Sequence, residues 1–172
     1  LVEVAADFGS LGDHGGGALE LQNMLGKVDL VMGSFSKTFA SNGGFVAANS
    51  PAVKQYLKYY GSPHTFSNAL SPVQVATVRA ALQIVRADEG RRLRRQLMQV
   101  VLTLRSELQN HGVDCMGSPS AIVPVPIGDE KTARIASRLL AQRGVLANLV
   151  EFPAVAVGAA IQGSVLAGDR KD

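Results

Sequence analysis

The residues of this chain that are best suited to chemistry are a lysine and two serines that directly follow a short apolar run. Ser34, Ser36 and Lys37 come after residues 28–32 (VDLVM) and before the pair Gly43-Gly44. A lysine amine can attack a carbonyl carbon and form a Schiff base when its surroundings keep it available. Small hydroxyls can donate to a phosphate, and paired glycines allow a tight turn. These residue types suit a lysine nucleophile beside a phosphate-binding loop, but a motif this short, taken alone, favours an exposed lysine in a serine-rich loop.

The composition indicates an ordinary globular protein. The chain has 172 residues, 47% of them hydrophobic, which is enough for a packed core. With 17 basic and 14 acidic residues, the net charge of +3 gives no reason to expect nucleic-acid binding. Cys115 is the one cysteine, and no cationic-then-apolar segment opens the chain, so we expect a reducing, cytoplasmic location. No apolar run approaches the roughly 20 residues that span a bilayer. Because the sequence opens at Leu1 within an apolar run, we expect a fragment or a shortened gene product.

The hydrophobic pattern predicts an α/β chain in which a glycine-rich loop covers residues 9–17. Residues 122–150 have a strand–helix–strand rhythm, and the preceding long helix is expected to contain a domain boundary. The boundary divides the chain into residues 1–95 and 96–172. The predicted strands are 1–6, 28–32, 45–48, 122–127 and 145–150, and the predicted helices are 19–25, 51–60, one that opens at Ser71-Pro72, 88–110 and 129–143. The helix that opens at Ser71-Pro72 has apolar residues at helical spacing, which predicts a core-facing side.

Two further patterns could bind phosphate, and simpler interpretations are favoured for both. The arginine-rich run at 91–95 begins the long predicted helix after Asp88-Glu89, with no aromatic residue nearby, which predicts a solvent-exposed helical face rather than an RNA site. The run Gly15-Gly16-Gly17 lacks the lysine and hydroxyl residue of a P-loop and the spacing of a dinucleotide fingerprint, so a flexible loop is expected. No metal-ligand spacing occurs in the sequence.

The lysine segment is part of a longer pattern that resembles a known family. Residues 33–48 (GSFSKTFASNGGFVAA) and 61–72 (GSPHTFSNALSP) are similar to the cofactor-lysine region and the cross-subunit segment of α-oxoamine synthases. Residues 121–127, 144–147 and the pair Phe152-Pro153 also follow the family order. The resemblance covers nearly the whole chain and corresponds to the C-terminal half or somewhat more of a family member. These enzymes use pyridoxal 5'-phosphate (PLP) to condense an amino acid with an acyl-CoA.

The resemblance implies a fold-type I PLP-dependent transferase of the α/β class. Residues 1–95 would form the C-terminal part of a large PLP-binding domain with a mostly parallel sheet. Residues 96–172 would form a truncated small C-terminal α+β domain. The resemblance also implies a homodimer with a shared active site.

The same resemblance implies roles for individual residues. Lys37 would hold PLP as a Schiff base, with Ser34 and Ser36 at the cofactor. Phe66 and Ser67 would reach the cofactor phosphate of the second subunit, and Glu3 would face the pyridine nitrogen.

Three positions depart from the family pattern. Glu3 stands in place of an aspartate, Ala6 in place of a histidine that touches the cofactor's phenolic oxygen, and Ile161 in place of an arginine that binds the substrate carboxylate. These departures keep two alternatives open. One is a noncatalytic partner or regulatory subunit of a related synthase, and the other is a fold-type I aminotransferase.

Overall fold

The computed structural model describes residues 1–149 and 156–160. The chain divides into two compact units, Leu1–Arg94 and Arg95–Asp172. The predicted pair Phe152-Pro153, the end of the predicted strand 145–150, and Ile161 lie outside the described residues. Whether the two units correspond to the large and small domains implied by the resemblance stays a prediction.

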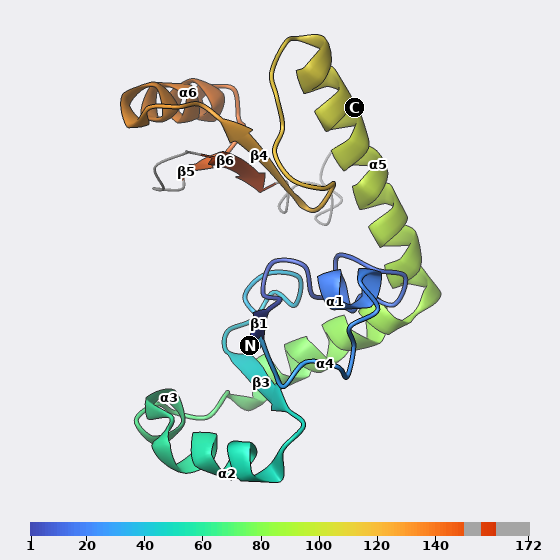
Figure 1. Cartoon of the computed structure of the whole chain (residues 1–172), viewed down its shortest axis with the longest axis vertical. Coiled ribbons are helices and arrows are strands. Elements are labelled where there is room, and N and C mark those ends of the chain that lie inside the picture. The colour runs from blue at the N-terminus through green and yellow to red at the C-terminus, as the bar shows by residue number, and fades with distance from the viewer. Residues whose placement is uncertain (150–155, 161–172) are drawn as a thin grey trace. The chain divides into compact units, whose positions relative to one another are not determined.

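The first unit holds a three-stranded sheet and most of the helices, coloured blue to green in Figure 1. Its elements are β1 (Val2–Glu3), α1 (Gly17–Leu21), β2 (Leu30–Ser34), β3 (Gly44–Ala48), α2 (Pro51–Tyr60), α3 (Ser62–Thr65) and α4 (Pro72–Arg86). The long helix α5 (Asp88–Asn110) begins in this unit and continues into the second.

The sheet of the first unit has the order β1-β2-β3 and contains one parallel and one antiparallel pair. Val2 pairs with Val31 in the parallel pair. The predicted strand 1–6 is shorter than expected, because the carbonyl of Val4 accepts hydrogen bonds from Asp7 N (3.3 Å) and Phe8 N (2.9 Å). These bonds turn the chain away from the sheet directly after Val4, whose own N–H still donates to Met32 O at 2.8 Å.

The predicted helix bounds are most accurate where the sequence has a clear signal at the start of the helix and a long run of apolar residues at helical spacing. The predicted helix 51–60 is confirmed as α2, which begins after Ser50, whose hydroxyl accepts from Val53 N. The predicted helix 88–110 is confirmed as α5, with two acids in its first turn. The predicted helix 19–25 was misplaced, since α1 lies at Gly17–Leu21. Asp7 Oδ2 accepts from Ala18 N at 2.6 Å and thereby satisfies an N–H in the first turn of α1.

Helix α4 is anchored to the rest of the first unit at its two ends. Ser71 and Gln74 form a capping box at its start, and Ser41 Oγ donates to Gln74 O at 3.3 Å. At its other end Val85 is buried, with 8% of its surface exposed. Between these ends Val75 and Leu82 stay exposed, so the predicted core-facing side of this helix is only partly covered within the described residues.

Four phenylalanines form a cluster of ring contacts in the first unit. The rings of Phe8 and Phe39 stack with their centroids 5.0 Å apart, and Phe8 also meets the edge of Phe45 at 5.2 Å. Phe35 lies 5.6 Å from Phe39 and 5.7 Å from Phe45, which completes a closed ring of contacts. Phe39 is 1% exposed. This phenylalanine quartet fastens the turn after β1 to the loop between β2 and β3.

The second unit, coloured yellow to orange in Figure 1, contains β4 (Ile122–Pro126), α6 (Glu130–Gln142), β5 (Asn148–Leu149) and β6 (Ala156–Ala160). Its sheet has the order β4-β6-β5, and both outer strands are antiparallel to β6. The predicted strand–helix–strand order is confirmed, but β5 begins three residues later than predicted. Strand β6 was not predicted because its sequence, AVGAA, is mostly small residues without the enrichment that marks strands.

The side chains that organise the second unit are polar as well as apolar. Arg105 donates to the carbonyls of Cys115, Met116 and Gly117, which fixes the segment that follows α5. Asp129 caps α6 by accepting from Thr132 N at 2.9 Å, and the hydrogen bonds from Thr132 hold the pKa of Asp129 below its ordinary value. Across the described residues, no helix qualifies as a bilayer-spanning segment.

Replacing Phe39 by alanine should destabilise the first unit strongly, because the substitution opens a cavity in the phenylalanine quartet. We expect a loss of about 3–5 kcal/mol in the free energy of unfolding, measured by urea denaturation. Phe66→Ala is the matched control, since Phe66 is 86% exposed and its truncation should change stability by about 0.5 kcal/mol at most. Equal effects of the two substitutions would contradict the packing described.

Candidate functional site

Lys37 lies in the loop of residues 35–43 that joins β2 to β3. Phe35 N donates to Gly43 O and Ser41 N donates to Phe35 O, both at 2.9 Å, so the two sides of the loop are bonded together. Ala40 N donates to Lys37 O at 3.0 Å, which makes a turn around the lysine. The Lys37 side chain is exposed and makes no ion pair or hydrogen bond within the described residues. Its amine is therefore presented to solvent by a closed, well-supported loop.

The two predicted serines lie together where β2 ends. Ser34 Oγ and Ser36 Oγ are 2.7 Å apart, and Ser36 N donates to Ser34 Oγ at 3.1 Å. Ser34 is half-buried and Ser36 is exposed. The structure thus joins two hydroxyls into one polar pair directly before Lys37, an arrangement able to donate to a phosphate oxygen.

Glu3 lies at the same edge of the sheet as the lysine loop. It ends β1, pairs with Met32 of β2, and its carboxylate accepts a hydrogen bond from Ala5 N. Because β1 and β2 are parallel, their carboxyl ends meet at one edge, and this edge of an open α/β sheet is where ligands bind. Ala6 lies half-buried in the turn that follows and offers no hydrogen-bonding side chain.

Glycines let the backbone of the lysine loop pack closely. A side chain at Gly33 would collide with the ring of Phe45, its partner across the β2–β3 pair. Gly43 has a φ of 83°, in the left-handed region that favours glycine, and a Cβ there would lie 2.6 Å from the side chain of Leu70. A Cβ at Gly44 would collide with the carbonyl oxygen of Gly33, so neither of the paired glycines leaves room for a side chain.

The remaining predicted residues, Phe66 and Ser67, share no hydrogen bond or ring contact with Lys37 within residues 1–149. Phe66 is 86% exposed, and the hydroxyl of Ser67 donates only to the carbonyl of Asn68 at 3.3 Å. Their segment meets the lysine loop through Leu70 against Gly43. A role of Phe66 and Ser67 toward a second subunit stays a prediction.

The glycine-rich segment is a loop, as predicted, and it closes on a carboxylate. Glu20 accepts hydrogen bonds from His14 N at 2.9 Å and from Gly16 N at 2.7 Å. Gly9 N also donates to Gly15 O at 2.8 Å. Burial acts to raise the pKa of Glu20, but the N–H groups of His14 and Gly16 and the charge of His14 outweigh it and hold the pKa below its ordinary value. Since Glu20 already binds the N–H groups that a phosphate would need, the segment is unsuited to cradle one.

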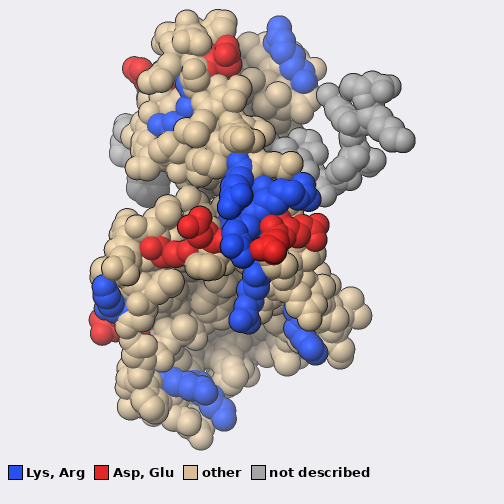
Figure 2. All heavy atoms as spheres, turned by 90° about the vertical axis from the view of Figure 1, so that its right-hand side faces the viewer, with Lys and Arg blue, Asp and Glu red and all other residues tan. Residues whose placement is uncertain are grey.

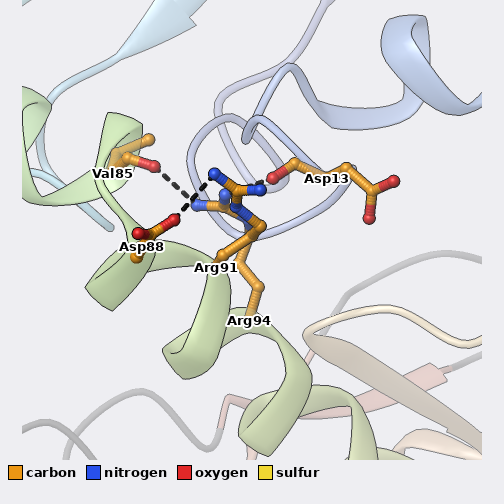
Figure 3. Close-up of polar contacts among 5 residues, drawn as sticks. All are labelled: Asp13, Val85, Asp88, Arg91 and Arg94. Atoms are coloured by element: carbon orange, nitrogen blue, oxygen red, sulfur yellow. Dashed lines mark hydrogen bonds and ion pairs between the residues drawn. The ribbon is translucent and has the colours of Figure 1, made fainter.

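Arg94 corrects the prediction that the whole arginine run faces solvent. Its side chain is 9% exposed, and Figure 3 shows the guanidinium between the end of α4 and the glycine-rich loop. Nη1 donates to Val85 O at 2.9 Å and Nη2 donates to Asp13 O. Burial lowers the pKa of Arg94, which lacks a carboxylate ligand at its buried Nε atom. The sequence held a signal for this, because Arg94 lies three residues before Leu97 and seven before Val101, on the apolar side of the helix.

The other arginines of the run do face solvent, as predicted. Arg91, Arg92 and Arg95 are exposed, and Arg91 pairs with Asp88 at 2.8 Å. Figure 2 shows basic side chains gathered around the start of α5, with acidic side chains on both sides of them. A mixed surface of this kind is typical of a solvated helical face rather than of a nucleic-acid site. No cluster of metal-binding side chains occurs among the residues that the structure describes.

The fold is that of fold-type I PLP-dependent enzymes, and comparison with known proteins gives the family. Residues 7–164 match the family described as aminotransferase class I and II, and the chain belongs to this family. The family is PLP-dependent.

The chain is similar to individual enzymes of known sequence or structure. It is 37% identical over 154 residues to a putative 8-amino-7-oxononanoate synthase 2 of Mycobacterium tuberculosis, covering 90% of this chain and 20% of that protein. It is 34% identical over 158 residues to the 8-amino-7-oxononanoate synthase of Geobacter sulfurreducens, covering 92% and 40%. A solved serine palmitoyltransferase of Sphingomonas wittichii matches with a TM-score of 0.80 at 25% identity, covering 95% of this chain and 42% of that one.

These matches confirm the resemblance to α-oxoamine synthases and the fold. The chain spans between 20% and 42% of the length of these three proteins.

Replacing Arg94 by methionine should destabilise the first unit, because the carbonyls of Val85 and Asp13 would lose their donor in a buried setting. We expect a loss of about 2–3 kcal/mol in the free energy of unfolding, measured by urea denaturation. Arg95→Met, on the exposed side of the same helix, should cost about 0.5 kcal/mol or less. The opposite order of these two effects would show that Arg94 does not anchor the loop.

The contribution of Glu20 to stability should depend on pH. Because its folded-state pKa lies below the ordinary value, Glu20 stabilises the fold fully at pH above that value, and the stabilisation is lost as the pH falls through the folded-state pKa. Glu20→Gln should therefore be less stable than the wild type at neutral pH, and the gap should close in acid. Unfolding free energies across a pH series measure the gap. The exposed Glu89→Gln is the control, and a gap for Glu20→Gln that stays constant with pH would contradict this account.

Proposed function

We propose that this chain carries the cofactor-lysine part of a PLP-dependent acyltransferase site of the α-oxoamine synthase type. The observation that carries the proposal is the gathering of Lys37, the Ser34–Ser36 hydroxyl pair and Glu3 at the carboxyl edge of the parallel pair β1–β2. Membership of a PLP-dependent family supports it. Lys37 is the proposed catalytic residue, and Ser34, Ser36 and Glu3 are the proposed cofactor-binding residues of the same chain.

The side chains at this edge fit the chemical groups of PLP. PLP has an aldehyde, a phosphate and a pyridine nitrogen, and the edge offers a free amine, two neighbouring hydroxyls and a carboxylate. When bound, PLP supplies a ring that withdraws electrons from the α-carbon of an amino acid. The exposed Lys37 amine is unpaired within the described residues, so no ion pair has to break before it reacts.

The residues of this chain would then act by binding, orienting and moving protons. Lys37 Nζ would hold the cofactor, and its amine would take the proton from the substrate α-carbon. Ser34 and Ser36 would donate to the phosphate. Glu3 would hold the proton on the pyridine nitrogen, for which its carboxylate would exchange or share the hydrogen bond from Ala5 N.

Enclosure of the lysine is proposed to come from a second copy of the chain. Lys37 is exposed, and catalysis by a lysine amine benefits from a site that excludes water. Phe66, 86% exposed, offers a large apolar surface, and Ser67 offers a hydroxyl next to it. We propose a homodimer in which Phe66 and Ser67 of one copy complete the site of the other. The proposed substrates are an amino acid and an acyl-CoA, and the proposed location is the cytoplasm.

Two other functions would use the same surface. Ala6 removes a hydrogen-bonding group from the site, which favours a noncatalytic partner or regulatory subunit of a related synthase. An aminotransferase would use the lysine without an acyl-CoA. Release of CoA from an acyl-CoA and an amino acid indicates the synthase, whereas formation of a keto acid without CoA release indicates transamination.

The test is to trap PLP on the protein. The purified chain is mixed with PLP, treated with borohydride, digested, and mapped by mass spectrometry. We expect a borohydride-stable phosphopyridoxyl group on the peptide that contains Lys37, and its loss in Lys37→Ala. Lys27→Ala is the matched control, because Lys27 is also an exposed loop lysine of this unit and its removal should leave the labelling of Lys37 unchanged.

Labelling spread evenly over the exposed lysines, or unchanged in Lys37→Ala, would overturn the assignment of Lys37. The noncatalytic alternative would then be favoured. Circular dichroism of each variant shows whether the fold is retained, which we expect since both lysines are exposed.

A further inference from the structure

The loop that presents Lys37 also contains an asparagine directly before a glycine. Asn42-Gly43 lies between the lysine and the start of β3, and both residues are exposed. Among the asparagines of the chain, Asn42 alone precedes a glycine. The others are Asn23, Asn49, Asn68, Asn110 and Asn148. A glycine at this position leaves the backbone nitrogen open to approach from the asparagine side chain.

We propose that Asn42 is a site of spontaneous deamidation within the lysine loop. The deprotonated backbone nitrogen of Gly43 attacks Cγ of Asn42 and forms a new C–N bond. The bond from Cγ to the side-chain nitrogen breaks, and that nitrogen leaves as ammonia after taking up a proton from water. Water then opens the five-membered imide at either carbonyl. The product is aspartate or isoaspartate, in which the main chain runs through the former side chain.

The local structure leaves both reacting groups free. Within residues 1–149, the Asn42 side chain makes no hydrogen bond and the Gly43 N–H donates none. Asn49 is different, because its side-chain nitrogen donates to Gly26 O at 3.3 Å and to Val28 O at 3.1 Å. Asn68 is exposed, like Asn42, but the next residue is an alanine whose methyl group hinders the attack. Of these three asparagines, only Asn42 has both an unbonded side chain and a following residue without a side chain.

The fold also holds the glycine in place. Gly43 has a φ of 83°, and a Cβ there would meet Leu70. A larger residue, which would slow the attack on Asn42, is therefore strained at this position. The reactive pair is thus a consequence of the same close packing that builds the lysine loop.

Formation of isoaspartate would disturb the support of Lys37. Two hydrogen bonds flank Asn42, one from Ser41 N to Phe35 O and one from Phe35 N to Gly43 O. An isoaspartyl residue adds one carbon to the main chain between Ser41 and Gly43. The two hydrogen bonds to Phe35 therefore cannot keep their geometry at the same time. We expect the loop to open and Lys37 to lose its fixed position. This consequence for cofactor binding rests on the proposed function, whereas the modification itself does not.

The experiment ages the purified chain at mildly alkaline pH and follows two readouts. Peptide mapping measures aspartate and isoaspartate at each asparagine, and PLP trapping with borohydride measures labelling of Lys37. We expect modification to accumulate at Asn42 well ahead of Asn68, and labelling to be lost in proportion to isoaspartate. Asn42→Gln should keep its labelling during ageing, because the longer side chain closes a ring much more slowly. Asn68→Gln is the matched control and should lose labelling as the wild type does.

The readouts separate failure of this inference from failure of the proposed function. Modification at Asn42 no faster than at Asn68 overturns the site, whatever the labelling. Modification at Asn42 with unchanged labelling of Lys37 overturns its effect on the lysine loop. Fresh protein that never labels at Lys37 overturns the proposed function, and the peptide map still decides whether Asn42 is modified.

Discussion

The packing of Phe8 against Phe39 is the contact on which the first unit most depends. Phe8 belongs to the turn that follows β1, and Phe39 belongs to the loop that presents Lys37. Their stacked rings join two segments that are far apart in the sequence, and the contacts of Phe35 and Phe45 close the ring. Aromatic rings bury large apolar areas and prefer defined orientations, so this cluster gives both stability and direction. The loop that presents the exposed Lys37 is therefore held by the ring contacts of Phe35 and Phe39.

Polar contacts hold the surroundings of this cluster. Arg94 binds the glycine-rich loop to the end of α4, and Glu20 binds the N–H groups inside the same loop. Gly9 N donates to Gly15 O, and this bond closes the glycine-rich loop directly after Phe8. Apart from the bond to Val85 O in α4, each of these bonds satisfies a backbone group in the glycine-rich loop. The loop between β1 and β2 is therefore ordered by charged side chains as well as by its buried Leu11 and Leu19.

Local signals in the sequence sufficed for the long helices and for the two strands around Lys37. Helix α5 was predicted with its observed bounds, because its acidic first turn and its long apolar stripe are both local features. Helix α2 likewise has proline at its start, after the capping Ser50. The two strand predictions that failed have different causes, a local turn for β1 and a partner distant in sequence for β6. Strand β1 is shortened by bonds to the Val4 carbonyl, and β6 is defined by its pairing with β4 rather than by its composition.

The site was predictable to a similar extent. Lys37, Ser34 and Ser36 form one continuous segment, and the structure keeps the two hydroxyls together. Glu3 reaches the same edge because β1 is parallel to β2, a pairing that a strand prediction alone does not give. The burial of Arg94 was not predicted, because the run of four arginines suggested that all of them face solvent. Their positions around the helix differ, however, and Arg94 lies on the apolar side.

The contact of Gly33 with the ring of Phe45 restricts how this part of the sequence can evolve. The two residues face each other across the β2–β3 pair, and no side chain fits at position 33 while the phenylalanine keeps its place. A smaller residue at 45 would make room for a larger one at 33, but it would also remove one of the four rings. The two positions are therefore energetically coupled, and substitutions at them should be accepted in pairs rather than singly. In descendants of this chain, position 33 should stay glycine for as long as position 45 stays aromatic.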